Sequence, residues 1–156
     1  MIQRKQTLFL LGAVIAFVLC LFLPLAGVQP TGMGAETLIH NLGLTSGDQG
    51  ISFESTCLPL FLLVAVSAVL ALVTIFMYKN RKLQMTLCST ILLFSVLWYI
   101  DFVLIFFGVV PVIDEAGKMQ LHFGACLPLI AIILTFMAKK GVEADEKLVR
   151  AADRIR

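Results

Sequence analysis

Four apolar runs, each close to the length of a membrane-spanning helix, constrain this chain more than any other feature. The runs cover residues 7–25, 58–78, 85–107 and 121–138. About 20 apolar residues, each rising ~1.5 Å, cross the ~30 Å hydrocarbon core of a bilayer. The chain is 60% hydrophobic and 14% charged, whereas soluble domains have roughly 45–50% and 25%, so lipid must be part of its solvent. The sequence predicts an all-α polytopic membrane protein, a bundle of four transmembrane helices.

Basic residues are confined almost entirely to one side of these runs. Of the twelve Lys and Arg residues, all except Lys118 precede the first run, lie between the second and third, or follow the fourth. Cytoplasmic segments of membrane proteins carry the excess of Lys and Arg, so both termini are predicted to be cytoplasmic. The first run follows Arg4 and Lys5. Its apolar stretch is longer than that of a signal peptide and no A-x-A cleavage site follows it, so we predict a retained signal-anchor helix.

This orientation divides the chain into a transmembrane domain, residues 1–140, and a charged cytoplasmic tail, residues 141–156. The tail is predicted to form a short helix of its own, because Glu143 and Lys147 are an acid-first pair four residues apart. The connections 26–57 and 108–120 then face outward. The first contains six glycines and neither Lys nor Arg, which predicts a flexible, solvated connection with a short strand near residues 51–53. His40 in this connection is expected to be inert, and the second connection is expected to be a turn.

Two segments on the predicted cytoplasmic side are candidate partner or lipid contacts. The turn between the second and third runs is basic, and one face of the tail is apolar; the residues concerned are Lys79, Arg81 and Lys82, and Leu148, Ala152 and Ile155. Basic residues near anionic inner-leaflet lipids gain about 1 kcal/mol each, and the apolar face suits the membrane surface or a protein partner. The alternatives are that the basic turn only anchors the topology and that the tail is a solvated helix.

Asp101 and His122 are the ionisable side chains associated with the apolar runs. Asp101 lies within the third run, and His122 lies at the outer end of the fourth. An acid inside a span costs on the order of 3 kcal/mol at the membrane centre, and it normally faces the bundle interior and pairs. We therefore expect Asp101 and His122 to approach each other in the outer leaflet, as a candidate ion or proton site. The alternatives are a purely structural pair, or an Asp101 that reaches interfacial water.

Other chemistry is weakly represented. The cysteines show no metal-ligand spacing and are predicted to be packing residues, with a disulfide between Cys57 and Cys126 as the alternative. Small residues four apart, Gly12 with Ala16 and Ser67 with Ala71, predict close helix packing. No nucleophile–base arrangement, phosphate-binding loop or metal cluster is recognisable. We therefore predict no catalytic residue, no cofactor and no metal, and the net charge of +2 gives no reason to expect nucleic-acid binding.

Three segments at the start, middle and end of the chain resemble a known family. They are MIQRKQTL at residues 1–8, YKNRKLQ at residues 78–84 and DEKLVRAADRIR at residues 145–156. Together they resemble the "domain of unknown function 4293" family, which consists of small four-helix inner-membrane proteins from one phylum of Gram-negative bacteria. The resemblance implies this architecture and a location in the bacterial inner membrane. It brings no activity, cofactor or catalytic residue.

Two functional hypotheses follow from these observations. The first is a non-enzymatic accessory or scaffold subunit whose basic cytoplasmic face contacts anionic lipid and a protein partner, either as a single chain or as a homo-oligomer. The second is a small carrier or sensor that uses Asp101, with or without His122, as a cation or proton site.

Overall fold

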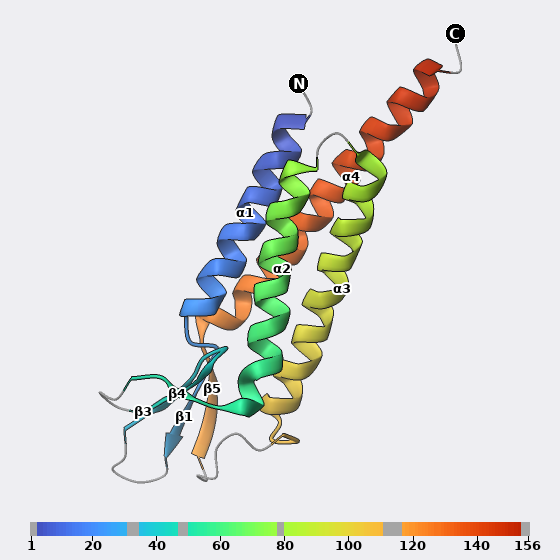
Figure 1. The fold of residues 1–156 in the computed structure, drawn as a ribbon. Helices are drawn as coiled ribbons and strands as arrows, with labels where there is room; N and C mark the ends of the chain where they lie inside the picture. Colours follow the sequence, from blue (N-terminus) through green and yellow to red (C-terminus); the bar gives the residue numbers. More distant parts are fainter. Residues whose placement is uncertain (1–2, 31–34, 47–49, 78–79, 111–116, 154–156) are drawn as a thin grey trace.

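The computed structural model describes residues 3–30, 35–46, 50–77, 80–110 and 117–153. Within these residues the chain forms four long helices, two short 3-10 helices and five short strands (Figure 1). The helices form a bundle, and the strands gather at one end of it. We call this end the sheet end. The opposite end, where both termini lie, is called the basic end.

The four helices correspond to the four apolar runs. Their bounds are α1 Gln3–Phe22, α2 Leu58–Phe76, α3 Arg81–Phe106 and α4 Leu127–Asp153, and the 3-10 helices η1 Ser55–Cys57 and η2 Phe123–Cys126 lead into α2 and α4. Each helix contacts the next one along the chain, and α4 contacts α1, so the bundle is a closed ring in chain order. The segments 55–76, 81–106 and 123–149 are long and apolar enough to cross a membrane, whereas the apolar part of α1, Gln6–Phe22, is shorter.

Proline and glycine determine where several helices begin and end. α1 stops before Pro24, which has no N–H to donate to the carbonyl group of Cys20 four residues earlier. α3 ends at Phe106, and Gly108 adopts a φ of +71°, the left-handed conformation that commonly follows a helix C-terminus. Pro59 lies in the first turn of α2, where the missing N–H would have had no partner in any case.

A five-stranded antiparallel sheet covers the sheet end. Its strands are β1 Ala26–Pro30, β2 Thr37–Ile39, β3 Gly43–Ser46, β4 Ser52–Phe53 and β5 Gly117–Leu121, in the spatial order β4-β3-β2-β1-β5. The β1–β5 ladder runs from Ala26 paired with Leu121 to Pro30 paired with Gly117. It joins the connections 26–57 and 108–120, which are far apart in the sequence.

The sheet corrects the prediction of an all-α protein. Only the strand expected near residues 51–53 is confirmed, as β4. The connection 26–57, predicted to be flexible, supplies four strands, and the connection 108–120, predicted to be a turn, supplies β5. Sequence reasoning missed this because β1 pairs with a strand about 90 residues away, as the Pro30–Gly117 pair shows.

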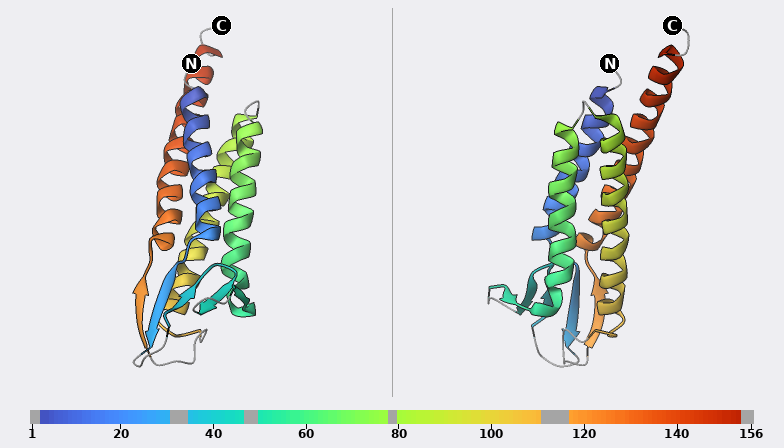
Figure 2. Two further views of the ribbon diagram at one scale, coloured as in Figure 1. Left: turned by 90° about the vertical axis from the view of Figure 1, so that its left-hand side faces the viewer. Right: turned by 45° about the vertical axis from the view of Figure 1, so that its right-hand side comes forward.

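α4 also differs from the prediction, because it continues through Gly141 to Asp153. The expected short tail helix is the last part of this 27-residue helix, which is about 40 Å long at ~1.5 Å per residue. A Cβ at Gly141 would lie 2.9 Å from Gln6 Cγ, so glycine at this position leaves room for the side chain of Gln6. Figure 2 shows α4 extending beyond the other helices at the basic end.

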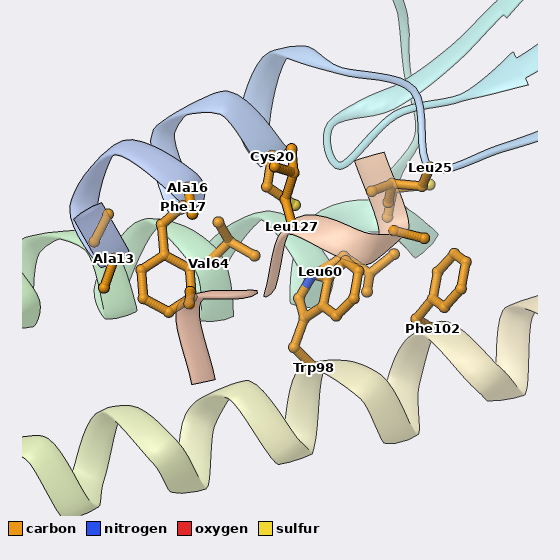
Figure 3. Packing of buried hydrophobic residues seen from close by; sticks show 14 of the residues in the cluster. Ala13, Ala16, Phe17, Cys20, Leu25, Leu60, Val64, Trp98, Phe102 and Leu127 are labelled. Carbon is orange, nitrogen blue, oxygen red and sulfur yellow. The ribbon is translucent and has the colours of Figure 1, made fainter. Parts of the chain in front are cut away.

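The core lies between the helices and reaches into the sheet. Figure 3 shows Phe17 of α1, Leu60 and Val64 of α2, and Trp98 and Phe102 of α3 packed together. The rings of Trp98 and Phe102 are stacked, with centroids 5.3 Å apart. The predicted small-residue patterns serve packing within this bundle: Ala16, Ser67 and Ala71 are buried, and a Cβ on Gly12 would lie 3.1 Å from Leu134 Cδ1 of α4.

α1 and α4 are shifted toward the basic end relative to α2 and α3 (Figure 2). Tyr99 Oη of α3 donates a hydrogen bond of 2.8 Å to the carbonyl of Ala125, just before α4. Tyr99 lies seven residues before Phe106, so α4 begins about 10 Å inside the sheet end of α3 at ~1.5 Å per residue. The end of α1 lies at the same level, because Gly124 N–H donates to the carbonyl of Pro24 at 3.1 Å. β1 and β5 fill the space that this shift leaves beside α2 and α3.

Candidate functional site

A buried asparagine ties the sheet to the helices at the sheet end. Asn41, in the turn between β2 and β3, is fully buried. Its Nδ2 donates to the carbonyl of Cys20 at 2.6 Å, and its Oδ1 accepts a hydrogen bond from Trp98 Nε1 at 3.1 Å. The carbonyl of Cys20 is the one that Pro24 cannot satisfy, so Asn41 caps the C-terminus of α1 from a distant part of the chain. No local pattern distinguishes Asn41 from an ordinary turn residue, and sequence reasoning missed it.

His122 pairs with a glutamate of the sheet end. His122 Nε2 lies 3.1 Å from Glu36 Oε1, and both side chains are about one-third exposed. The pair sits over Gly27 of β1, and a Cβ at this position would collide with both Glu36 and His122. Glycine is therefore needed at position 27 for the pair to form. Glu36 was not a predicted site residue, since its partner is 86 positions away.

His40 lies near this pair, in an ordered turn and not in the mobile loop that the sequence predicted. The backbone N–H of His40 donates to the carbonyl of Gly43 at 2.8 Å. The Nδ1 of its ring is buried without a hydrogen-bond partner among the described residues. Burial lowers the pKa of His40 below its ordinary value, a hydrogen bond with the backbone of Phe22 opposes this shift, and the nearby His122 adds to it. The neutral imidazole is therefore favoured in the folded chain.

Asp101 and His122 are not paired in the described part of the chain. Within the described part of the chain no hydrogen bond or ion pair joins the two residues, because His122 is turned toward Glu36 and Asp101 Oδ2 is buried without a hydrogen-bond partner. The predicted carboxylate–imidazole pair is therefore not formed. Asp101 does lie within a membrane-length helix, five residues before the end of α3. Its Oδ2 accepts no hydrogen bond from any described protein group.

The cysteines behave as packing residues. All four lie in described segments and are free thiols; Cys20, Cys57 and Cys88 are buried, and Cys126 is exposed. The alternative of a Cys57–Cys126 disulfide is thus not realised in this structure. The described residues also contain no group of three His, Cys, Asp or Glu side chains arranged to hold a metal ion.

A second polar network connects three helices at the basic end. Gln6 Nε2 of α1 donates to Asp145 Oδ2 of α4 at 2.7 Å, and both side chains are buried. Arg81 Nη1, at the start of α3, donates to the carbonyl of Asp145 at 3.4 Å. Asp145 belongs to the segment predicted to be a separate tail, and this network fixes that segment to the bundle. Sequence reasoning therefore missed both Gln6 and Asp145.

The predicted contact residues at the basic end are only partly described. Lys82 and Leu148 are exposed, whereas Arg81 is half-buried through its contact with α4. Lys79 and Ile155 lie outside the described residues, as does the side chain of Ala152. Lys140 Nζ lies over the ring of Phe136, 4.8 Å from its centroid, a cation–π contact of a kind common where a helix leaves the apolar region.

The fold and these networks define a helical membrane protein with a small antiparallel sheet across one end of its bundle. Most of the outward-facing side chains of its helices are apolar, as lipid contact requires. The sequence profile of the family described as Domain of unknown function (DUF4293) matches residues 2–155. The chain therefore belongs to this family, and the resemblance found in its three motifs is confirmed. No curated protein matches the chain.

Proposed function

We propose that this protein is a non-enzymatic accessory or scaffold subunit of the bacterial inner membrane, which uses its basic end to contact lipid and a protein partner in the cytoplasm. In this proposal the four helices cross the membrane and both termini are cytoplasmic, because the basic residues cluster at the end where the termini lie. The family match is compatible with this role and assigns no reaction.

The continuous α4 is the observation that carries the proposal. Its last turns project beyond α1, α2 and α3, and the contacts of Asp145 with Gln6 and Arg81 hold them in a fixed direction. Leu148 and Val149 are exposed on this projection. A rigid helix that presents apolar side chains beyond the bundle suits docking into a groove of a partner protein.

Cations at the same end support a contact with anionic lipid. Lys82 is exposed at the start of α3, and Lys139 and Lys140 lie where α4 passes from apolar to charged residues. In the described part of the chain none of the three forms a salt bridge with a carboxylate. Each is therefore available to a lipid phosphate group, and each such contact is worth about 1 kcal/mol near an anionic surface.

The test is co-purification from native membranes with chains altered at the projection. Leu148→Glu places a charge on the docking face without touching the Gln6–Asp145 contact, and it is expected to abolish recovery of the partner. Lys118→Glu, an exposed charge change at the sheet end, serves as the matched control and should retain the partner. If the two variants recover the same proteins as the wild-type chain, the docking role of α4 is wrong.

A second candidate function is a small carrier or sensor with a cation or proton site at Asp101. The supporting observation is the buried Oδ2 of Asp101, which lacks a protein partner among the described residues; a buried carboxylate oxygen normally has one. His122 would contribute only if it left Glu36. Vesicles containing the purified chain and a pH-sensitive dye test the proposal under an imposed sodium or proton gradient. Flux that Asp101→Asn removes and Glu143→Gln preserves would support this role, and equal behaviour of all three chains would exclude it.

A further inference from the structure

We propose that the sheet is inserted into the membrane leaflet at its own end, with Leu121, Phe123 and Phe53 facing phospholipid acyl chains near the headgroup boundary. The lipid contact surface thus continues from the helices onto the strands. This inference concerns the end of the molecule opposite the proposed docking site, and it is independent of that site.

The length of α4 provides the first step. Its apolar part, from Leu127 to Ala138, contains 12 residues and measures about 18 Å at ~1.5 Å per residue. The whole segment 123–149 is long enough to cross a membrane, but from Lys139 onward it carries charged residues. A hydrocarbon core of about 30 Å is therefore roughly 12 Å thicker than the uncharged part of α4. α4 begins about 10 Å inside the sheet end of α3 at ~1.5 Å per residue, so the missing length lies on the sheet side. There the chain continues as η2 and β5.

Exposed apolar side chains lie on η2 and on both edge strands of the sheet. Phe123 of η2 is 68% exposed and Leu121 of β5 is 58% exposed, and on the opposite edge of the sheet Phe53 of β4 is 61% exposed. Neighbouring side chains at the end of α3, such as Phe107, are exposed as well. Single exposed apolar residues are ordinary on a soluble surface. Here Leu121 and Phe123 lie just before α4 in the chain, and Phe53 lies just before η1 and α2, so they follow directly on the apolar helices.

The polar groups of β5 set a limit to the insertion. β5 is the last strand in the sheet order, so one of its edges is unpaired within the described sheet. Unpaired backbone groups cost several kcal/mol each in hydrocarbon, so this edge must reach water or headgroups. Strands rise ~3.3 Å per residue, which places Lys118 about 17 Å from Phe123 along the chain. Lys118 and Gln120 are both exposed. The strand therefore leaves the leaflet, with Phe123 deepest and Lys118 in the headgroup region or in water.

The main experiment places a single tryptophan at different depths in the full chain, reconstituted in phosphatidylcholine vesicles. Trp98 is the only tryptophan, so Trp98→Phe provides a background into which Phe123→Trp, Phe53→Trp and Lys118→Trp are introduced one at a time. Replacing the lipid by one brominated in the upper part of its acyl chains should remove most of the emission at positions 123 and 53. The probe at position 118 should keep its emission in that lipid and lose it to aqueous acrylamide.

Position 118 also controls for the preference of tryptophan itself for membrane interfaces. If Lys118→Trp is quenched by brominated lipid as strongly as Phe123→Trp, the inferred depth order is wrong. If all three probes respond to acrylamide and none to brominated lipid, the sheet lies in water and the proposal is overturned.

A second measurement uses the wild-type chain, because Trp98→Phe removes a buried hydrogen bond. A phospholipid carrying a diazirine close to its glycerol group is photolysed in the same vesicles, and the labelled peptides are identified by mass spectrometry. Adducts are expected within residues 51–53 and 121–123 as well as on the helices. Adducts confined to the helices would overturn the proposal, and they would leave the docking role of Leu148 untouched.

Discussion

Replacement of Asn41 by alanine should destabilise the protein by several kcal/mol. The substitution leaves two buried groups without partners, the carbonyl of Cys20 and the indole N–H of Trp98, which Asn41 now satisfies at 2.6 Å and 3.1 Å. A buried polar group that loses its partner costs about 1–3 kcal/mol, so the two groups together cost about 2–6 kcal/mol. Pro24 cannot relieve the loss at Cys20, because it has no N–H.

The measurement is reversible unfolding in mixed detergent micelles, followed by the emission of Trp98. This residue is the only tryptophan, and it reports directly on the site because it is the partner of Asn41. Asn80→Ala is the matched control: Asn80 is exposed, and its side chain makes no capping hydrogen bond at the start of α3. Exposed substitutions of this kind usually change stability by less than about 0.5 kcal/mol.

A double-mutant cycle with Trp98→Phe separates the two hydrogen bonds, with unfolding followed by circular dichroism for all four chains. Asn41→Ala already leaves the indole N–H unpaired, so the double variant should cost less than the sum of the two single variants. If Asn41→Ala unfolds at the same detergent concentration as Asn80→Ala, Asn41 does not cap α1, and the account of how the sheet is held to the bundle is wrong.

Three further predictions concern other parts of the fold. Gly124→Ala places a Cβ against the backbone carbonyl of Pro24 and should cost about 1–3 kcal/mol in the same unfolding assay, whereas Gly50→Ala, in open space, should have no comparable effect. Gln6→Ala removes the partner of the buried Asp145 carboxylate and should speed amide hydrogen exchange in the last turns of α4; unchanged exchange would show that this contact does not hold the helix. Burial lowers the pKa of His40 in the folded chain below its ordinary value of 6.5. As the pH drops below about 6.5, the unfolded chain therefore binds the proton first and stability should fall. The fall should level off below the folded-state pKa. His40→Gln should make that part of the pH profile flatter, and an unchanged profile would contradict the assignment.

The helical part of the fold was predictable because it follows from local sequence. Runs of about 20 apolar residues indicate membrane-length helices wherever they occur, and Pro24 marks the end of α1 without any knowledge of its surroundings. The expected break before residue 141 was wrong for a physical reason. Glycine is a poor helix former on its own, but Gly141 lies inside α4 and packs against Gln6, a contact that only the packed structure reveals.

The sheet and the site depend on contacts between distant residues. The strands Thr37–Ile39 and Gly43–Ser46 are too short for an alternating pattern to indicate them. β1 and β5 can form hydrogen bonds with each other only after the helices have brought them together. The pairing of Asp101 with His122 was inferred from a common depth in the membrane. Depth alone does not determine which side chains meet, and His122, between β5 and η2, pairs with Glu36 instead.

The pairing of β1 with β5 has a consequence for the order in which the protein is made. Leu121, the β5 partner of Ala26, is synthesised 95 residues later (121 − 26). The Oδ1 of Asn41 likewise has no partner until Trp98 of α3 has been synthesised. The sheet is therefore completed only after β5, which follows α3 and precedes α4 in the chain, has been synthesised. A chain that stops after α3 lacks β5 and leaves an edge of β1 open to non-native pairing. Closure of the sheet thus requires β1, which follows α1, and β5, which follows α3, to lie at the same end of the bundle.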